Sequence, residues 1–239
     1  MKNQPGNEIE IQRNYYAETA HLYNEMHVNE EDPHFFALSF MEAVLDYLKI
    51  GSILDIGSGT GRTIAYIKEK QPDMTIRGIE PVKELREVGY SQGVSRDNLI
   101  EGDATELEFA DRSFDLVCEF GVLHHIKNPE KEISEMLRVA DKAIFISDSN
   151  NFGQGSRPAR IVKQAINSLR LWKIIDLIKT GGKGYTISEG DGLAYSYSIF
   201  TNYRLIKKHC ERMHMFNTSS GNNNFYRSAS TIALLGIKN

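Results

Sequence analysis

The stretch ILDIGSGTGR, residues 53–62, carries three glycines at alternate positions just after an acid that ends a short apolar run. The apolar run SILDI predicts a buried strand, and the residues after Gly61 predict a helix from about residue 62 to 70. Gly57, Gly59 and Gly61 permit a tight turn and a close approach of a ligand to the backbone. The first N–H groups of the helix have no partner within the helix. The stretch therefore predicts a strand, a ligand-binding turn and a helix.

The same alternation continues along the chain from Gly51 to Asp148. Further strand candidates are TIRGIE, NLIEGD, FDLVCEF and AIFISDS, and further helices are expected near residues 82–90 and from Asn128 onward. Strands that alternate with helices at this rhythm predict βαβ units and an α/β fold with a mostly parallel, doubly wound sheet. Ligands of such sheets bind beyond the carboxyl ends of the strands, so the glycine turn is expected to lie at a binding crevice.

The segments outside this core have other patterns. Residues 1–14 are polar and are expected to be loose, and aromatic and small residues at helical spacing predict a helix over about 15–26. Asp32 and Pro33 predict the start of an amphipathic helix. HMFNTS and STIALLGI predict an antiparallel hairpin at the sheet edge. We expect a single domain, divided into a helical cap (1–50), a core (51–148), a lid insertion (149–204), and a C-terminal helix and hairpin (205–239).

The composition favours a soluble enzyme or binding protein of the cytoplasm. The net charge is −4, which argues against a nucleic-acid binder, because such proteins usually carry a basic excess. Cys118 and Cys210 form neither a disulfide framework nor a metal-binding spacing. The N-terminus lacks the apolar region of a signal peptide, and no apolar run is long enough to span a membrane. No metal is expected.

The glycine turn does not fit a dinucleotide site. That fingerprint requires G-x-G-x-x-G, whereas here the spacing is G-x-G-x-G and Arg62 follows. Asp55 would also repel a pyrophosphate, but it would suit a ligand that carries a cationic amine. A dehydrogenase is therefore disfavoured.

Four segments together carry a resemblance to a known family. LDIGSGTGR, IRGIEP, EGDATEL and FDLVCEFGVLHHIKNP resemble, in order and in spacing, the motifs of the class I S-adenosylmethionine-dependent methyltransferases. The resemblance covers about residues 50–148 and, more loosely, 205–237. It implies a Rossmann-like fold with a seven-stranded sheet and an antiparallel C-terminal strand. It also implies S-adenosylmethionine as the cofactor.

The resemblance assigns roles in binding this cofactor. Glu80 corresponds to the acid that accepts the ribose hydroxyls, and Asp103 to the acid that bonds the exocyclic amine of adenine. Glu119 ends a strand where it could approach the methionine ammonium, although a salt bridge on the helix side would explain it as well. Tyr16 lies in a segment that resembles the family's lid helix. The expected cofactor residues are Asp55, Gly57, Ser58, Gly59, Gly61, Glu80, Pro81, Gly102, Asp103, Ala104, Glu119, Phe120 and Tyr16.

Three residues are candidates for the base that removes a proton from the methyl acceptor. His124 and His125 follow the fourth strand, and Asp148 follows the fifth. Each also has a structural explanation, such as packing on the sheet or loop capping. We expect methylation of a hydroxyl group on a small, sugar-like or anionic metabolite. An N-methyltransferase and a non-catalytic cofactor-binding subunit are the alternatives, and the oligomeric state is left open.

The insertion contains a basic amphipathic run. Between residues 152 and 185 the chain has seven Lys or Arg residues and one acid, Asp176, with apolar residues between them. A packed helix with a solvated face would explain the run. So would an electrostatic funnel for a phosphorylated or sugar-linked substrate, or weak attachment to a membrane surface. The glycines and aromatic residues of GYTISEGDGLAYSYSIF predict a lid over the acceptor.

Overall fold

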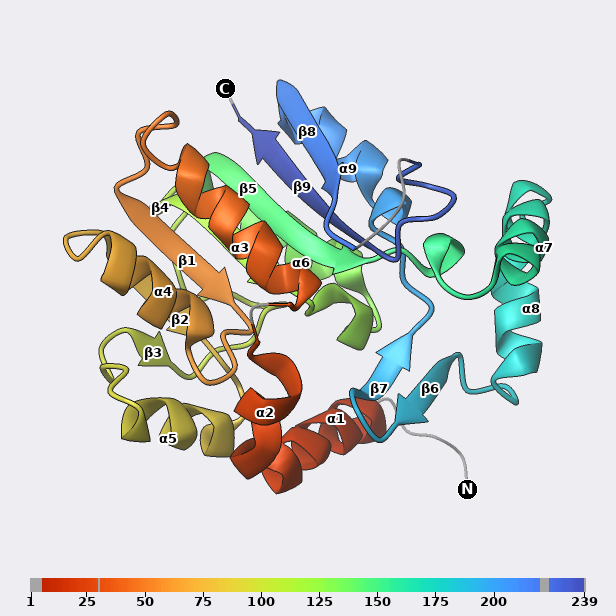
Figure 1. The fold of residues 1–239 in the computed structure, drawn as a ribbon, viewed down its shortest axis with the longest axis horizontal. Coiled ribbons are helices and arrows are strands. Elements are labelled where there is room, and N and C mark those ends of the chain that lie inside the picture. The colour runs from red at the N-terminus through yellow and green to blue at the C-terminus, as the bar shows by residue number, and fades with distance from the viewer. Residues whose placement is uncertain (1–5, 30, 220–223, 239) are drawn as a thin grey trace.

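A seven-stranded sheet forms the centre of the molecule (Figure 1). The computed structural model describes residues 6–29, 31–219 and 224–238. The strand order is β3-β2-β1-β4-β5-β9-β8, in which β9 is antiparallel to both of its neighbours and the other pairs are parallel. The strands are β1 (Ser52–Ile56), β2 (Thr75–Ile79), β3 (Leu99–Ile100), β4 (Phe114–Phe120), β5 (Ala140–Ser149), β8 (Arg212–Asn217) and β9 (Thr231–Ile237). The α/β fold predicted from the sequence is confirmed.

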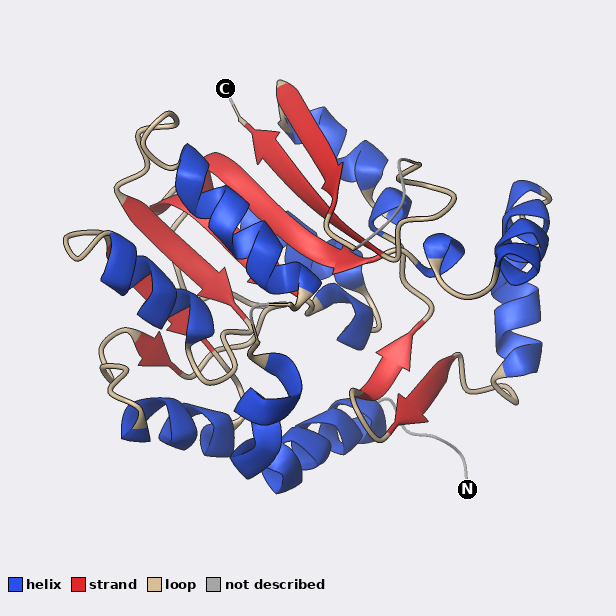
Figure 2. Cartoon of the chain, viewed as in Figure 1, coloured by secondary structure: helices blue, strands red, loops and turns tan. Residues whose placement is uncertain are grey.

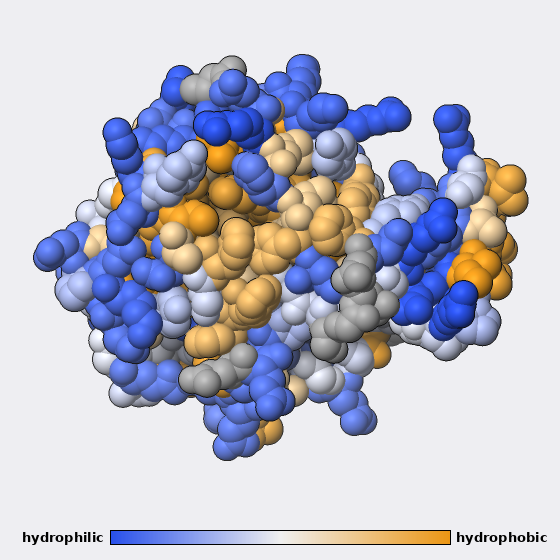
Figure 3. All heavy atoms as spheres, turned by 45° about the horizontal axis from the view of Figure 1, so that its top comes forward, coloured by the Kyte–Doolittle hydropathy of each residue, from blue (hydrophilic) through white to orange (hydrophobic). Residues whose placement is uncertain are grey.

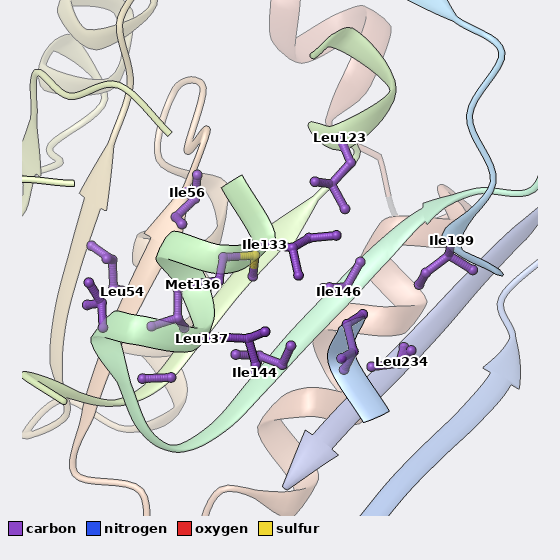
Figure 4. Packing of buried hydrophobic residues seen from close by; sticks show 14 of the residues in the cluster. Leu54, Ile56, Leu123, Ile133, Met136, Leu137, Ile144, Ile146, Ile199 and Leu234 are labelled. Carbon is purple, nitrogen blue, oxygen red and sulfur yellow. The ribbon is translucent and has the colours of Figure 1, made fainter. Parts of the chain in front are cut away.

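Helices cover both faces of this sheet (Figure 2). α3 (Pro33–Val44) and α4 (Arg62–Lys70) pack on one face, and α6 (Pro129–Val139) and α9 (Tyr203–His209) pack on the other. α5 (Lys83–Ser91) follows β2. Figure 4 shows Ile133 and Met136 of α6 among the buried aliphatic side chains of β1 and β5, such as Leu54 and Ile144. The continuous apolar character of these strands follows from burial on both faces.

The strand order reverses direction between β1 and β4. This reversal creates the crevice that was predicted from the glycine stretch. β1 pairs with β2 on one side and with β4 on the other. The chain continues from β1 to β2 and β3 in one direction and then returns to β4 and β5 in the other. The loops after β1, β2 and β4 therefore diverge at the carboxyl ends of their strands, where open α/β sheets bind ligands.

The N-terminal segment differs from the prediction. α1 (Gly6–Thr19) begins within the segment expected to be loose, and it continues through a 3₁₀ turn (Ala20–Leu22) into α2 (Tyr23–His27). The prediction failed because the inward-facing side chains of α1 include polar ones: Glu8 and Gln12 are both buried. The start of α3 matches the prediction, since Asp32 accepts a hydrogen bond from the backbone N–H of His34 at 2.8 Å and Pro33 follows it.

The insertion between β5 and α9 contains two small units. α7 (Arg157–Ser168) and α8 (Trp172–Lys179) form a helical hairpin that projects away from the sheet on the right of Figure 1. β6 (Tyr185–Ser188) and β7 (Gly192–Tyr195) form an antiparallel hairpin that lies beside α1. Within the described ranges, none of the helices has the combined length and apolar character needed to cross a bilayer.

Candidate active site

A cavity of about 340 Å³ lies at the carboxyl ends of β1, β2 and β4 and is closed on one side by α1. Its volume is within the range typical of small-molecule sites. Nine residues predicted from the sequence line it: Tyr16, Gly57, Glu80, Pro81, Gly102, Asp103, Ala104, Phe120 and His125. The cavity therefore collects side chains and loops from four separate motifs at one place.

The turn after β1 requires its glycines. Gly57 has a φ of +65°, and a Cβ atom there would lie 2.4 Å from a methyl group of Val122. Gly59 has a φ of +54°, and its Cβ would lie 2.5 Å from the hydroxyl of Tyr23. A side chain at either position would be strained and would collide with the wall of the site. Gly59 and Gly61 themselves do not line the main cavity.

Glu80 directly follows β2 and places a buried carboxylate in the cavity wall. One of its oxygens accepts a hydrogen bond from the backbone N–H of Gly59 at 3.1 Å, and the other accepts one from Val82 at 2.9 Å. Burial raises the pKa of Glu80 to about 7, although these two donors act in the opposite direction. The two backbone donors thus stabilise the Glu80 carboxylate only in part. A ligand whose hydroxyl groups donate hydrogen bonds to Glu80 would stabilise the ionised form further.

Asp103 and Arg13 form the outer edge of the cavity. An Arg13 guanidinium nitrogen lies 3.0 Å from a carboxylate oxygen of Asp103, and both side chains are roughly half exposed. The other oxygen of Asp103 accepts hydrogen bonds from the backbone and the hydroxyl of Thr105. Burial opposes ionisation, but Thr105 and Arg13 outweigh it and lower the pKa of Asp103. Asp103 is therefore ionised at neutral pH and can accept a hydrogen bond from an amine.

Asp55 and Ser58 do not line the main cavity. They lie in a small adjoining space of about 20 Å³, which shares Gly57, Tyr23 and Phe120 with the main cavity. The Ser58 hydroxyl donates a hydrogen bond to Asp55. Burial raises the pKa of Asp55 to about 6 against the effect of that bond. A cationic group that reached this space would be stabilised by the carboxylate.

Two histidines and an aspartate meet at the inner end of the main cavity. Nε2 of His124 lies 3.2 Å from one oxygen of Asp191, and Nε2 of His125 lies 3.4 Å from the other. The two imidazole rings are 4.0 Å apart. Nδ1 of His125 donates to the carbonyl of Leu193 at 2.7 Å, and the hydroxyl of Tyr16 lies 3.1 Å from Nε2 of His125. Because a carbonyl oxygen can only accept, Nδ1 of His125 carries a proton, and Nε2 is the ring atom that faces Tyr16 and Asp191.

Asp148 differs from the prediction because it does not reach either cavity. It is fully buried behind His124, where its Oδ1 lies 2.9 Å from His124 Nδ1. Burial disfavours a charge on His124, but Asp148 and Asp191 outweigh this effect and raise the pKa of His124 to about 10. His124 is therefore an imidazolium at neutral pH, held between two carboxylates. It cannot accept a proton in that state.

Glu119 also lies away from the cavity in which the sequence analysis expected it. The side chain is fully buried, and one oxygen accepts a hydrogen bond from the backbone of Val122 at 2.8 Å. Burial, together with the neighbouring Asp148 and Glu132, raises the pKa of Glu119 well above its usual range. Burial thus disfavours a charge on this carboxyl, and Glu119 does not line the main cavity where a ligand's ammonium group could meet it.

The hairpin of β6 and β7 brings Asp191 to the histidines, and contacts with α1 fix it there. The side-chain oxygen of Gln12 accepts a hydrogen bond from the backbone of Leu193 at 2.5 Å. Tyr15 donates to the carbonyl of Glu189 at 2.6 Å, and Tyr195 donates to Glu8 at 2.9 Å. The sequence analysis predicted a lid from the segment that contains Asp191 and Tyr195, but it did not single out Asp191, Gln12 or Glu8. The position of Asp191 between two glycines, in EGDGL, was the available signal.

A second cavity, of about 200 Å³, lies on the other side of this cluster. His124 and Asp191 line it, whereas His125 lines the main cavity and Tyr195 lines both. Hydroxyl, amide and charged side chains make up most of its wall: Ser149, Asn151, Gln154, Asp176, Lys179, Thr180, Thr186, Ser196 and Tyr197. The histidine cluster is thus a partition between a cofactor-sized cavity and a polar one.

The cluster also contains three atoms that could act as metal ligands. One nitrogen from each histidine and one oxygen of Asp191 lie within 4.8 Å of one another. Binding of a metal through the nitrogen of His124 would require that imidazolium to lose its proton, which Asp148 and Asp191 oppose. The arrangement favours an ion-paired cluster over a metal centre.

Comparisons with known proteins agree with this geometry. Residues 54–143 match the model of a family described as a methyltransferase domain. The chain is 30% identical over 135 residues to phosphatidylethanolamine N-methyltransferase of Cereibacter sphaeroides and, over the same length, to ajmaline N-methyltransferase of Rauvolfia serpentina. These matches cover 48% and 51% of this chain. The chain spans 58% and 46% of the two relatives, about half of their length.

Solved structures share the fold over nearly the whole chain. A magnesium protoporphyrin IX methyltransferase from Synechocystis, with bound S-adenosylhomocysteine, aligns with a TM-score of 0.61 at 14% identity, covering 97% of this chain and all of that one. A methyltransferase from Thermotoga maritima aligns with a TM-score of 0.59 at 16% identity, covering 95% of this chain and all of that one. The motifs and the sheet order agree with these comparisons: residues 54–143 match a methyltransferase domain, and the chain shares the fold of these methyltransferase structures.

Proposed function

We propose that this protein transfers the methyl group of S-adenosylmethionine to a hydroxyl group of a polar small molecule. One observation carries the proposal: the His124–His125–Asp191 cluster separates the cofactor-sized cavity from a polar cavity. Tyr195 lines both cavities, so an acceptor held in the polar cavity would extend past this cluster, beside Tyr195, to contact the methyl group directly. Alignment of two reactants and exclusion of water are the main requirements of methyl transfer.

The residues of the main cavity fit the cofactor. Glu80 would hold the ribose hydroxyls, because it is a buried carboxylate with an elevated pKa. Asp103 would bond the adenine amine, and the bare backbone at Gly57 would allow close contact. Asp55 would attract the methionine ammonium from the small adjoining space. When bound, the cofactor supplies a methyl group on a positively charged sulfur, which leaves as a neutral thioether.

His125 is the proposed general base. Its Nδ1 proton is engaged by Leu193, so the lone pair of Nε2 points toward Tyr16 and the cavity. A proton leaving an acceptor hydroxyl would pass to Nε2 as the oxygen bonds to the methyl carbon. A positioned base of this kind contributes about 10²–10⁴-fold to a rate. His124, already protonated, would instead position Asp191 and the neighbouring ring.

The second cavity supports a hydroxylated acceptor. Ser149, Asn151, Thr186 and Ser196 present hydroxyl and amide groups that suit several hydrogen bonds to one ligand. Among the described residues that line it, Lys179 is the single basic one other than His124, and Asp176 and Asp191 are acidic. This balance favours an uncharged, sugar-like acceptor over a phosphorylated one.

An amine acceptor is the second candidate. Asp191 is 42% exposed and could hold an ammonium group beside the histidines. The two relatives described above are named as N-methyltransferases, of phosphatidylethanolamine and of ajmaline. Methylation of a neutral amine needs less help from a base, because the nitrogen lone pair is available before its proton leaves. The effect of removing His125 therefore distinguishes the two candidates.

Calorimetry and an acceptor screen test the proposal. We expect S-adenosylhomocysteine to bind with micromolar affinity, and NAD and NADP not to bind. Glu80→Ala should abolish that binding, whereas Glu101→Ala, an exposed neighbour outside the cavity, should retain it. Transfer of a labelled methyl group is then measured on hydroxylated and amine-containing acceptors. Cofactor binding without transfer to any acceptor would favour a non-catalytic subunit, and binding only to nicotinamide nucleotides would overturn the assignment.

A further inference from the structure

The helical hairpin of α7 and α8 exposes its apolar side chains to solvent. Ile161 and Val162 on α7 are 60% and 56% exposed, and Ile174 and Ile178 on α8 are 57% and 70% exposed. Leu169 and Leu171 in the turn, and Leu177 on α8, are also exposed. The hairpin contributes eight of the sixteen large hydrophobic residues that are exposed within the described chain. Figure 3 shows apolar residues along the outer edge of this projecting part.

The polar side of α7 makes the contacts with the rest of the protein. Gln164 donates hydrogen bonds to the carbonyls of Phe152 and Arg227, both at 3.1 Å. Asn167 donates to the hydroxyl of Tyr226 at 2.8 Å, and Lys163 donates to the carbonyl of Asn151. An ordinary surface helix turns its apolar stripe toward the core and its polar face toward water. α7 has the opposite orientation.

α8 repeats this inverted orientation. Asp176 is buried and accepts a hydrogen bond from the hydroxyl of Ser196 at 2.7 Å. Ile174, Leu177 and Ile178 lie on the opposite, exposed side of the same helix. The first of the three explanations from the sequence, a packed helix with a solvated polar face, therefore does not describe this hairpin. Eight exposed apolar side chains gathered on one projecting hairpin indicate a site of interaction.

Positive charge surrounds the apolar surface. Residues 157–183 contain seven Lys or Arg residues and one acid, a net charge of +6 in a chain whose net charge is −4. Within the part of the chain that the structure describes, none of these seven side chains forms an ion pair with a carboxylate. The one acid, Asp176, faces inward. Arg157, Arg170, Lys173 and Lys183 are exposed beside the apolar residues, whereas Lys163 bonds inward and Lys179 lines the second cavity.

We propose that the α7–α8 hairpin docks onto the surface of a lipid bilayer that contains anionic headgroups. Helices with an apolar face and flanking Lys and Arg residues lie in the bilayer interface, where the apolar side chains enter the boundary of the acyl chains and the cations meet the headgroups. Residues such as Leu169, Ile174 and Ile178 would insert. Arg170 and Lys173, which alternate with them, would contact the anionic headgroups.

Charge argues against a second copy of the chain as the occupant. A symmetric dimer would bring the same surface of two chains together, so that each set of seven cations would face another set of seven. Like charges across an interface are costly, and interface cores are depleted in lysine. An anionic bilayer matches both the apolar and the positive character of the hairpin.

The docking surface adjoins the second cavity. Asp176, Lys179 and Thr180, at the end of α8, line that cavity. Docking would therefore bring the proposed acceptor site close to the bilayer, where an amphiphilic acceptor could enter it. This link to the acceptor rests on the proposed function, whereas the docking itself does not.

Vesicle flotation without cofactor or acceptor tests the docking separately from methyl transfer. We expect the full chain to float with vesicles of phosphatidylcholine and phosphatidylserine, to bind phosphatidylcholine vesicles weakly, and to dissociate as salt screens the charges. Replacement of both Arg170 and Lys173 by Gln should lower the partition coefficient about 30-fold, since each cation near an anionic surface contributes roughly a 5-fold gain. The pair Ile174→Ser and Ile178→Ser should lower it as well.

Matched substitutions elsewhere serve as controls. Tyr47→Ser removes a residue that is 76% exposed, and Lys208→Gln removes an exposed cation of α9, so neither should change flotation. All variants should keep the circular dichroism and the S-adenosylhomocysteine affinity of the parent. Equal flotation of the parent and the hairpin variants, or no flotation of the parent, would overturn the proposal. So would a dimer, detected by sedimentation, that the Ile174 and Ile178 substitutions dissociate.

Discussion

Asp191 Oδ2 lies 3.2 Å from Nε2 of His124, so the tip of the β6–β7 hairpin contacts the 3₁₀ turn that follows β4 (Leu123–His125), 67 residues away in the sequence. The other oxygen of Asp191 lies 3.4 Å from His125. One carboxylate thus contacts both histidines of the partition between the two cavities. Because the main cavity lies on the far side of these rings, changes at Asp191 should affect the acceptor more than the cofactor.

Asp191→Asn should therefore lower kcat/KM for the acceptor while leaving the affinity for S-adenosylhomocysteine nearly unchanged. Hydrogen bonds to charged groups contribute about 1.5–3 kcal/mol, which corresponds to a loss of about 10- to 100-fold. Glu189→Gln is the control, because its backbone carbonyl, and not its side chain, contacts Tyr15. Equal losses in both variants, or a loss of cofactor affinity in Asp191→Asn, would contradict the role of Asp191 at the partition.

Substitutions of His125 distinguish a hydroxyl acceptor from an amine acceptor. In His125→Asn, the side-chain amide can still donate to the carbonyl of Leu193, but no atom replaces Nε2. If the acceptor is a hydroxyl, we expect kcat to fall by about 10²–10⁴-fold with little change in the KM for the acceptor. A fall in kcat of less than about 10-fold would mean that His125 does not contribute to the rate as a general base. That result would favour the amine acceptor.

The sequence was informative where local pattern determines structure. The acid, the alternating glycines and the following helix lie within ten residues, and they place Gly57 at the cavity by local geometry alone. Glu80 follows β2 and Phe120 ends β4, and both strands are parallel neighbours of β1, so strand order brings these residues to the same edge. The Rossmann-like topology follows from the alternation of strands and helices.

Long-range contacts account for what the sequence could not predict. Asp191 reaches the histidines because its hairpin is held by Gln12, which is 181 residues from its partner Leu193. A packed helix was one of three explanations left open for the basic run that contains α7, because periodicity reports which residues share a face but not which way that face points. The bonds of Gln164 and Asn167 to distant backbone and side-chain groups decide its orientation.

The elevated pKa of Glu80 predicts a pH dependence of stability. Its pKa rises from a usual value of 4.5 to about 7 on folding, because burial penalises the charge. The contribution of Glu80 to the free energy of unfolding is thus complete below pH 4.5 and is lost as the pH rises through 7. The loss is about 3 kcal/mol over that range, by the linkage between pKa and free energy. Glu80→Gln removes this titration.

Urea unfolding of the parent and of Glu80→Gln at several pH values checks this expectation. The unfolding free energy of the parent, relative to that of the variant, should decrease between pH 4.5 and 8. Glu101→Gln, whose side chain is largely exposed, should follow the parent at every pH. A constant difference between the parent and Glu80→Gln across the range would show that Glu80 does not titrate abnormally.

Asp32 stabilises the fold through two separable contacts. Its Oδ1 caps α3 by accepting from the backbone of His34, and its Oδ2 lies 3.0 Å from the guanidinium of Arg62, with both side chains largely buried. Asp32→Asn keeps the cap and removes the charge, whereas Asp32→Ala removes both. Loss of an N-cap costs about 0.5–2 kcal/mol, so urea unfolding should rank Asp32→Ala below Asp32→Asn by about that amount. Equal stability of the two variants would assign the whole effect to the ion pair with Arg62.

Metal chelation should leave the activity intact. His124 is held as an imidazolium by Asp148 and Asp191, so a metal must displace a proton whose pKa is near 10 before it can bind there. We therefore expect substoichiometric metal in the purified protein by elemental analysis and the same rate of methyl transfer with and without EDTA. Loss of activity in EDTA that is restored by one divalent ion would assign His124, His125 and Asp191 as its ligands instead. In that case Asp191→Asn should also lower the affinity for that ion, which calorimetry with the metal alone would measure.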